Sequence, residues 1–262
     1  MDVVFHHGTP SLGRVYAPWE EDGIRLVGFD RSGYGDAPRR PGRSIADVVE
    51  EVVAVADAHG FDRFATWGIS GGGPHALACA ALLPDRVTAC AAIGSPAPRG
   101  AEALDWYADF GEGNVSEFQA AEHGEAALRA LVEQDDAADE AAGPAGLRDA
   151  LASLTSPVDA AVLDGPLLDY LWGIMRGAAV VDGWVDDDLA FVRPWGFDLG
   201  SIRVPVLIRH GEQDRFVPPA HARWLAEQIP GAELQLTADD GHLTLYEHGI
   251  PGVHDWLRRP RG

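Results

Sequence analysis

The 262-residue sequence predicts an α/β fold, in which helices cover both faces of a mostly parallel sheet. Three observations support this prediction. Short apolar segments alternate with helical ones, a serine lies on a glycine-rich turn between a strand and a helix, and one long helical segment interrupts the alternation. Hydrophobic residues make up 46% of the chain, which is enough for a large core.

The predicted strands are short apolar runs that end at turn-forming residues. They cover residues 3–5, 24–29, 64–67, 87–93, 204–208 and 233–236. Because helical segments separate them, we expect neighbouring strands to run parallel.

The predicted helices have recognisable ends. Ser44 is a candidate N-cap, with Asp47 three residues later, for a helix that runs to residue 58 and is closed by Gly60. A second helix is expected at residues 74–83, directly after the serine turn. A third is expected at residues 219–228, where a proline at the first position is compatible with a helix start.

The alternation stops at Ser95-Pro96-Ala97-Pro98 and resumes near residue 204. Residues 99–195 are helical in pattern, rich in large aromatic side chains and acidic, with 20 Asp and Glu against five Arg. We interpret them as a helical cap inserted into a core of residues 1–98 and 196–262. The acidic stretch 135–146 is a candidate flexible excursion, and most of the acidic charge is interpreted as a solvated surface.

Composition excludes several classes of function. A net charge of −21 disfavours nucleic acid and other polyanionic partners. The absence of lysine excludes Schiff-base and pyridoxal chemistry and a Walker-type phosphate loop. The pair His6-His7 has no further ligand at metal spacing, so no metal and no cofactor are expected.

The remaining compositional signals concern location and redox state. No signal peptide and no apolar run of about 20 residues are seen, so we expect a cytoplasmic protein without a membrane partner. Cys79 and Cys90 fall in a predicted helix and a predicted strand, where they are expected to be small buried hydrophobes.

Ser70 is the candidate nucleophile. It lies in Gly68-Ile69-Ser70-Gly71-Gly72, after an apolar strand and before a helix. The pattern G-x-S-x-G in this context is the nucleophile elbow, a turn so sharp that the flanking positions must lack bulk.

A nucleophilic serine requires a base, and the base requires a carboxylate that orients it. His242 and Asp214 are the candidates, since each lies in a loop that follows a predicted strand and the order Ser, Asp, His suits this arrangement. Other nearby carboxylates are Glu212, Asp239 and Asp240; the last two are too close in sequence to His242 to reach its ring readily.

The oxyanion of an acyl-transfer reaction requires two backbone donors. Gly71 N–H, at the start of the predicted helix, is one candidate, and Thr9 N–H in the loop after the first strand is the other. His7, Trp106 and Trp172 are candidate substrate contacts, although packing is an alternative role for each. His75 is expected to pack within its helix.

Together these motifs resemble serine-dependent enzymes of the α/β-hydrolase fold with a cap, similar to proline-iminopeptidase-like and haloperoxidase-like carboxylesterases. The matching segments are His7-Gly8-Thr9-Pro10, Asp30-Arg31-Ser32-Gly33-Tyr34-Gly35, residues 68–74, residues 211–218 and Gly241-His242. Asp30 and Gly35 are interpreted as structural. The family normally has antiparallel strands before the His-Gly loop; without them, segment 24–29 becomes an edge strand.

The resemblance implies hydrolysis of carboxylic esters through an acyl-enzyme, with small apolar or aromatic substrates. Alternatives are an aminopeptidase, in which acidic cap residues would hold the substrate ammonium, and a cofactor-free lyase or oxygenase. A small-ligand receptor with little turnover is an alternative of another class. The natural substrate and the oligomeric state stay open.

Overall fold

The computed structural model describes residues 1–176 and 178–259. Within these residues, six parallel strands form one sheet in the order β2-β1-β3-β4-β5-β6. The strands are β1 (Asp2–His6), β2 (Arg25–Gly28), β3 (Phe64–Ile69), β4 (Val87–Ile93), β5 (Val206–Gly211) and β6 (Glu233–Thr237). The predicted edge strand at residues 24–29 is therefore confirmed as β2.

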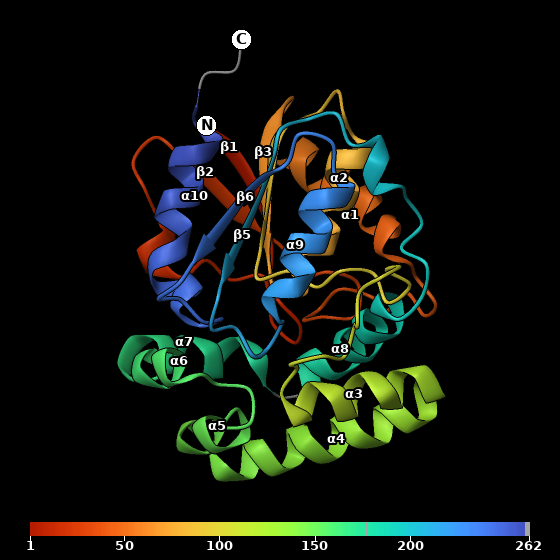
Figure 1. The fold of residues 1–262 in the computed structure, drawn as a ribbon, viewed down its shortest axis with the longest axis vertical. Coiled ribbons are helices and arrows are strands. Elements are labelled where there is room, and N and C mark those ends of the chain that lie inside the picture. The colour runs from red at the N-terminus through yellow and green to blue at the C-terminus, as the bar shows by residue number, and fades with distance from the viewer. Residues whose placement is uncertain (177, 260–262) are drawn as a thin grey trace.

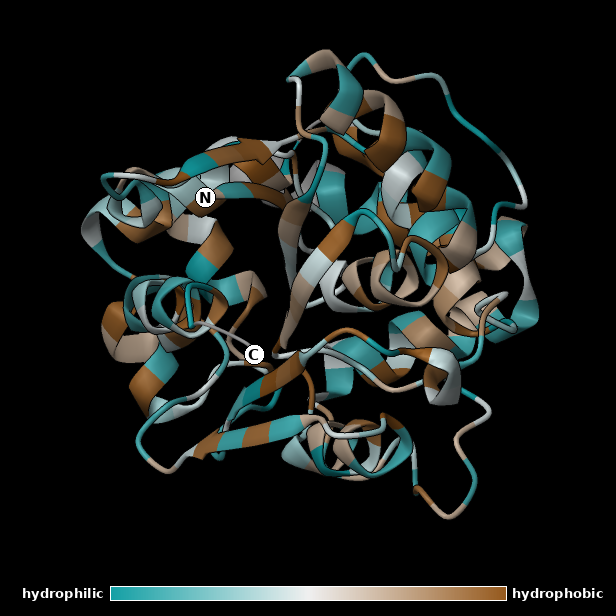
Figure 2. Cartoon of the chain, turned by 90° about the horizontal axis from the view of Figure 1, so that it is seen from above, coloured by the Kyte–Doolittle hydropathy of each residue, from teal (hydrophilic) through white to brown (hydrophobic). Residues whose placement is uncertain are grey.

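Helices cover both faces of the sheet (Figures 1 and 2). Helices α1 (Val48–Ala58), α2 (Gly72–Leu82) and α9 (Pro219–Gln228) pack on one face, and α10 (Ile250–Leu257) packs on the other. Successive residues of a strand point to opposite faces, so Val4 joins the first core and its neighbours Val3 and Phe5 join the second. Both cores lie against buried strands: β3 is buried at every position, and β4 at every position except Thr88.

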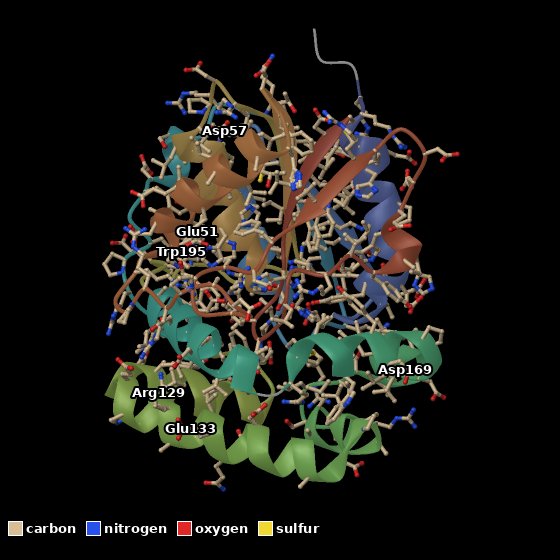
Figure 3. The ribbon with its side chains drawn as sticks, turned by 180° about the vertical axis from the view of Figure 1, so that it is seen from behind. Glu51, Asp57, Arg129, Glu133, Asp169 and Trp195 are labelled. Carbon is tan, nitrogen blue, oxygen red and sulfur yellow. The ribbon has the colours of Figure 1, made fainter. Side chains whose placement is uncertain are left out.

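The chain between β4 and β5 forms a separate layer of helices at one end of the molecule, far from the N-terminus (Figure 1). We call this layer, helices α3 to α8, the cap. Its helices are α3 (Glu112–His123), α4 (Glu125–Ala142), α5 (Pro144–Ala150), α6 (Pro157–Val162), α7 (Gly165–Met175) and α8 (Ala178–Phe191). Arg129 and Glu133 mark α4 at the outer side of the cap (Figure 3), and Arg129 binds Asp182 of α8 at 2.8 Å.

The loop after β2 is fixed to the core. Glu51 of α1 (Figure 3) accepts hydrogen bonds from the backbone N–H and the hydroxyl of Ser32, at 3.0 and 2.7 Å. Asp30 accepts from Gly13 N–H at 2.7 Å, and a Cβ at Gly35 would lie 2.4 Å from its carboxylate. These contacts agree with the structural interpretation of Asp30 and Gly35.

Most predicted elements lie within a few residues of the observed ones. Ser44 and Asp47 form the expected cap, with Ser44 N–H donating to the Asp47 carboxylate at 2.7 Å, although a 3-10 turn precedes α1. Helix α2 begins at Gly72, two residues earlier than expected, and α10 was not predicted. Cys79 and Cys90 are buried free thiols. None of the helices among the described residues has the length and apolar character that crossing a membrane would need.

Candidate active site

Ser70 occupies a strained turn between β3 and α2. Its φ of 53° lies in the left-handed region that non-glycine residues rarely adopt. Two backbone bonds hold the turn: Ser70 N–H donates to Ile93 O at 2.8 Å, and Gly73 N–H donates to Ser70 O at 3.0 Å. Strain of this kind persists where the surroundings over-determine it, and it is concentrated at functional sites.

The glycines around Ser70 are required by close backbone approach. A Cβ at Gly68 would lie 2.1 Å from Gly72 O, and one at Gly72 would lie 2.2 Å from His6 O. Since both neighbouring atoms belong to the backbone, neither could move aside. The G-x-S-x-G pattern therefore has here the steric cause that the sequence indicated.

Asp214 and His242 form a close buried pair in the loops after β5 and β6. The distance from His242 Nδ1 to Asp214 Oδ2 is 2.7 Å. The other oxygen of Asp214 accepts from Val217 N–H at 2.8 Å, which fixes the carboxylate. The ring of Phe216 stacks on the imidazole, with centroids 4.6 Å apart and planes 16° apart.

Burial and charge act on this pair in opposite directions. Burial disfavours the charged imidazole, yet the Asp214 carboxylate raises the pKa of His242 above its ordinary value. Burial alone would likewise raise the pKa of Asp214, but His242 and His210 hold it well below its usual range. The arrangement therefore stabilises an imidazolium beside a permanent carboxylate.

Ser70, after β3, and His242, in the loop after β6, both lie beside the end of β4. Ser70 is bonded to Ile93, and a Cβ on the next residue, Gly94, would lie 3.1 Å from Nδ1 of His242. Among the described residues no direct hydrogen bond joins the Ser70 hydroxyl to His242. Catalytic hydrogen bonds are often long without substrate and tighten when it binds.

The loop after β1 lies against Ser70 from the other side. A Cβ on Gly8 would be 3.5 Å from Ser70 Cβ, and one on Gly71 would be 2.5 Å from the Thr9 hydroxyl. Thr9 and Gly71 are thus adjacent beside the serine, at the start of α2. Backbone N–H groups at a helix start favour negative charge.

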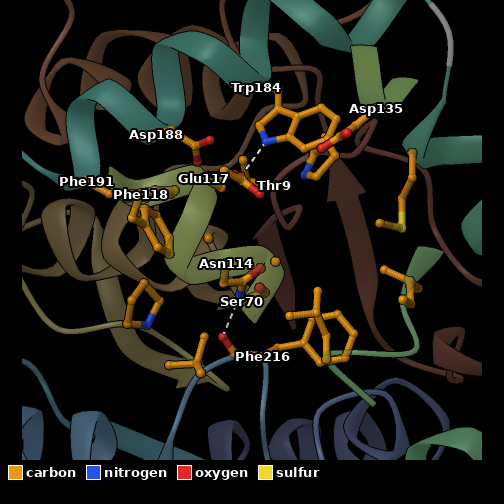
Figure 4. Close-up of a pocket in the computed structure, with 18 of the residues that line it drawn as sticks. Thr9, Ser70, Asn114, Glu117, Phe118, Asp135, Trp184, Asp188, Phe191 and Phe216 are labelled. Atoms are coloured by element: carbon orange, nitrogen blue, oxygen red, sulfur yellow. Dashed lines mark hydrogen bonds between the residues drawn. The ribbon is translucent and has the colours of Figure 1, made fainter. Parts of the chain in front are cut away.

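Ser70 faces a cavity of about 280 Å³ between core and cap (Figure 4). The core supplies Thr9, Gly71 and Phe216, and Asn114 of α3 donates to Phe216 O at 2.7 Å across the boundary. The cap supplies much of the apolar wall, including Phe118, Leu151, Leu154, Met175, Trp184 and Phe191.

One side of this cavity carries carboxyl groups (Figure 4). Glu117 of α3 and Asp188 of α8 lie together there, with Asp135 of α4 nearby. Trp184 Nε1 donates to Glu117 at 2.6 Å, whereas Asp188 Oδ2 has no donor within the described residues. Burial, and then the Glu117 carboxylate, raise the pKa of Asp188 well above its usual range.

The three candidate substrate contacts lie elsewhere, outside the cavity wall. His7 is buried and its ring lies between Gly8 O and the Arg31 N–H. Trp106 is buried among aromatic rings and donates to Ala97 O at 2.9 Å. Trp172 packs on the core beneath α7. None of the three rings lines the cavity, and substrate contact by these residues stays a prediction.

Two buried cap carboxylates next to the site were not anticipated. Asp187 of α8 binds the Thr9 hydroxyl at 2.6 Å. Asp159 of α6 accepts from Leu243 N–H at 2.7 Å and Thr244 N–H at 3.2 Å, directly after His242. The run Asp186-Asp187-Asp188 in an otherwise apolar helix end was the one sequence signal of buried carboxylates. All three residues are buried. The interpretation of the cap's acids as solvated is wrong for them.

A family model described as the alpha/beta hydrolase fold matches residues 3–137 and 188–249. The chain belongs to this family. A short segment of 54 residues is also 39% identical to the pimeloyl-[acyl-carrier protein] methyl ester esterase of Aromatoleum aromaticum. That match covers 21% of this chain and 22% of the enzyme, so the chain matches well under two thirds of that enzyme's length.

Solved structures of the same fold cover nearly the whole chain. A thermophilic esterase from Thermogutta terrifontis is 19% identical, with a TM-score of 0.70 over 98% of this chain and 89% of that one. The enol-lactonase of Burkholderia xenovorans is 21% identical, with a TM-score of 0.64 over 98% and 91%. At these identities the likeness establishes the fold.

Proposed function

We propose that this hydrolase cleaves carboxylic esters, with Ser70 as nucleophile, His242 as base and Asp214 as the residue that orients it. The supporting observation is the 2.7 Å contact of His242 Nδ1 with Asp214, beside a positive-φ serine that faces a cavity. In the same proposal residues 99–195 form the inserted cap, and the esterase and lactonase among the structural neighbours agree with ester chemistry.

The reaction would proceed in two halves. Ser70 Oγ attacks the ester carbonyl while His242 takes the hydroxyl proton, and the N–H groups of Thr9 and Gly71 bind the developing oxyanion. His242 then gives the proton to the leaving alcohol, which departs and leaves an acyl-serine. A water molecule, deprotonated by His242, attacks this acyl group, and Ser70 takes back its proton as the acid is released.

A panel of aryl esters of increasing acyl length, with fluorophosphonate labelling, tests this proposal. We expect ester turnover and labelling at Ser70, both lost in Ser70→Ala while the melting temperature is kept. Asp214→Asn should reduce turnover by about 10⁴-fold, because the imidazole loses its orienting acceptor. Activity retained by Ser70→Ala would refute the nucleophile, and labelling with negligible turnover would favour the receptor alternative.

The carboxyl groups of the cavity favour one second candidate, an aminopeptidase. Glu117 and Asp188 share one corner of the cavity, and one Asp188 oxygen has no donor among the described residues. A substrate ammonium would complete that corner while its acyl carbon faces Ser70. This arrangement suits aminoacyl amides and esters with a free amine.

Matched substrates separate the two candidates. An alanine aryl ester and amide, each with a free or an acetylated amine, should be compared with the acetate of the same phenol. An aminopeptidase would cleave the free-amine amide and lose that preference in Asp188→Asn. An esterase would cleave the acetate and the acetylated ester at least as well.

A further inference from the structure

Asp187 joins the cap to several core segments through one buried carboxylate. It lies on α8, and its side chain is fully buried. Oδ2 accepts from three donors at 2.6 to 2.8 Å, and Oδ1 accepts from a guanidinium at 2.6 Å and faces an imidazole nitrogen at 3.3 Å. Its partners among the described residues are Thr9, Arg31, Tyr34, Arg43 and His75.

Arg31 also binds the backbone of the loop that contains Thr9. Its guanidinium donates to His7 O at 2.7 Å and to Gly8 O at 3.1 Å, and it reaches the Thr9 hydroxyl at 3.3 Å. Its Nη2 also binds Asp187 at 2.6 Å. Arg31 therefore holds the carbonyls of His7 and Gly8, and Asp187 and Arg31 together hold the Thr9 side chain.

The same loop packs directly on the reacting residues. The Thr9 hydroxyl lies against the start of α2, where a Cβ on Gly71 would be 2.5 Å from it. Gly8 passes beside Ser70. A shift of about 1 Å at this loop would move one oxyanion donor relative to the other, and misplacement on that scale costs up to about 100-fold in rate.

From these contacts we propose that Asp187 is a positioning residue: through Thr9 and Arg31, this cap carboxylate sets the oxyanion donors beside Ser70, so that the site is complete only with α8 docked. The inference rests on the proposed function, since it assigns Thr9 N–H to the oxyanion. It assigns a role to the Asp30-to-Gly35 loop as well, because Arg31 and Tyr34 are held by the same carboxylate.

A purely structural role is the competing explanation, and α8 supplies a matched control. Asp186 is the preceding residue, is also buried, and binds Arg39 through two bonds of 2.9 and 2.8 Å. Among the described residues, Asp186 forms no hydrogen bond or ion pair with residues 7–9. Asp186→Asn therefore weakens a cap–core ion pair without touching the loop.

The experiment compares Asp187→Asn, Thr9→Val, Thr9→Ser and Asp186→Asn. For each, kcat and KM with an aryl acetate, the rate of fluorophosphonate labelling and the melting temperature are measured. We expect kcat and the labelling rate to fall about tenfold or more in Asp187→Asn and Thr9→Val, with KM changed less than about threefold. Thr9→Ser keeps the hydroxyl and should restore most of the rate.

The outcomes separate a failure of this inference from a failure of the proposed function. Asp186→Asn should lower the melting temperature while kcat and labelling stay near the wild-type values. Equal losses of kcat in Asp186→Asn and Asp187→Asn, or an unchanged kcat in Thr9→Val, would overturn the inference alone. If Asp187→Asn does not fold, Thr9→Val decides the question. A wild-type chain that neither cleaves the esters nor reacts with fluorophosphonate would overturn the proposed function as well.

Discussion

Asp187 and Asp188 are consecutive and equally buried residues of α8, yet their surroundings are opposite. Asp187 faces two guanidiniums, two hydroxyls and an imidazole, whereas Asp188 faces the cavity and the carboxyl of Glu117. Successive helix residues are rotated by about 100°, so neighbouring side chains point to different sides of the helix.

The difference shows in the ionisation of the two carboxyls. Burial raises the pKa of both, but Arg31 and Arg43 hold the pKa of Asp187 well below its usual range. Asp188 has no such cation among the described residues, and its pKa stays raised. The cost of burial is thus compensated by cations at Asp187 and left uncompensated at Asp188, which lines the cavity.

Removal of the compensated carboxylate should have the largest effect on stability. Asp187→Ala leaves the buried guanidiniums of Arg31 and Arg43 without the carboxylate that they bind. Breaking such a buried pair costs about 3–5 kcal/mol. We expect a lower urea midpoint with an unchanged m-value. A loss below about 1 kcal/mol would show that the network contributes little to folding.

The next test uses the proposed catalytic pair of Asp214 and His242, in which the carboxylate is compensated like that of Asp187. In the proposed mechanism His242 must be neutral to accept the Ser70 proton, and the pKa of His242 is raised above the ordinary 6.5. Ester kcat/KM should therefore fall about tenfold per pH unit below a midpoint higher than about 6.5. A profile from pH 5 to 9 measures this midpoint, and a value below 6 would contradict the assigned base.

Neutralising Asp188 should have a smaller effect of the opposite sign. The pKa of Asp188 in the folded chain lies above the unfolded value of about 3.9. Between these two pKa values the folded chain binds more protons than the unfolded chain. Stability is therefore lost as pH rises through the folded pKa. Asp188→Asn should therefore melt a few degrees higher than wild type at pH 8, where about 1 kcal/mol corresponds to roughly 2–4 °C.

The control for this effect is the same measurement near pH 4, where the gain should shrink. Asp187→Asn should show the reverse sign, because a depressed carboxyl pKa stabilises at every pH above the unfolded value. An Asp188→Asn variant less stable than wild type at pH 8 would mean that its carboxylate has a compensating partner.

The smallest effect is expected at an exposed carboxylate of the same helix. Asp182 pairs with Arg129 of α4 at 2.8 Å, but the Asp182 side chain is 49% exposed. Exposed pairs contribute about 0.2–1 kcal/mol. Asp182→Ala should therefore change the melting temperature by no more than about 1–4 °C. A loss as large as that of Asp187→Ala would remove the distinction between buried and exposed pairs.

Local sequence signals predicted the core well, for physical reasons that act over a few residues. The glycines around Ser70 and the apolar runs of the strands reflect close backbone approach and burial on both faces. Asp214 and His242 follow strands whose carboxyl ends meet at one edge, so their proximity could be anticipated from order and loop position.

The cap contacts could not be predicted in this way. Whether an aspartate is solvated or buried depends on partners far along the chain, and Asp187 meets Thr9 across 178 residues. Aromatic content led to the prediction of substrate contacts at Trp106 and Trp172, but both rings lie outside the cavity wall. Composition alone does not distinguish a ring that lines a cavity from one that packs in a core.

The contacts of Asp159 bear on how reactant and product enter and leave the cavity. It anchors α6 to the two residues after His242, as Asp187 anchors α8 to the loop of Thr9. If the whole cap moved away, both the proposed base, His242, and the loop of Thr9 would lose a support. We therefore expect reactant and product to pass through a gate that opens while α6 and α8 remain seated.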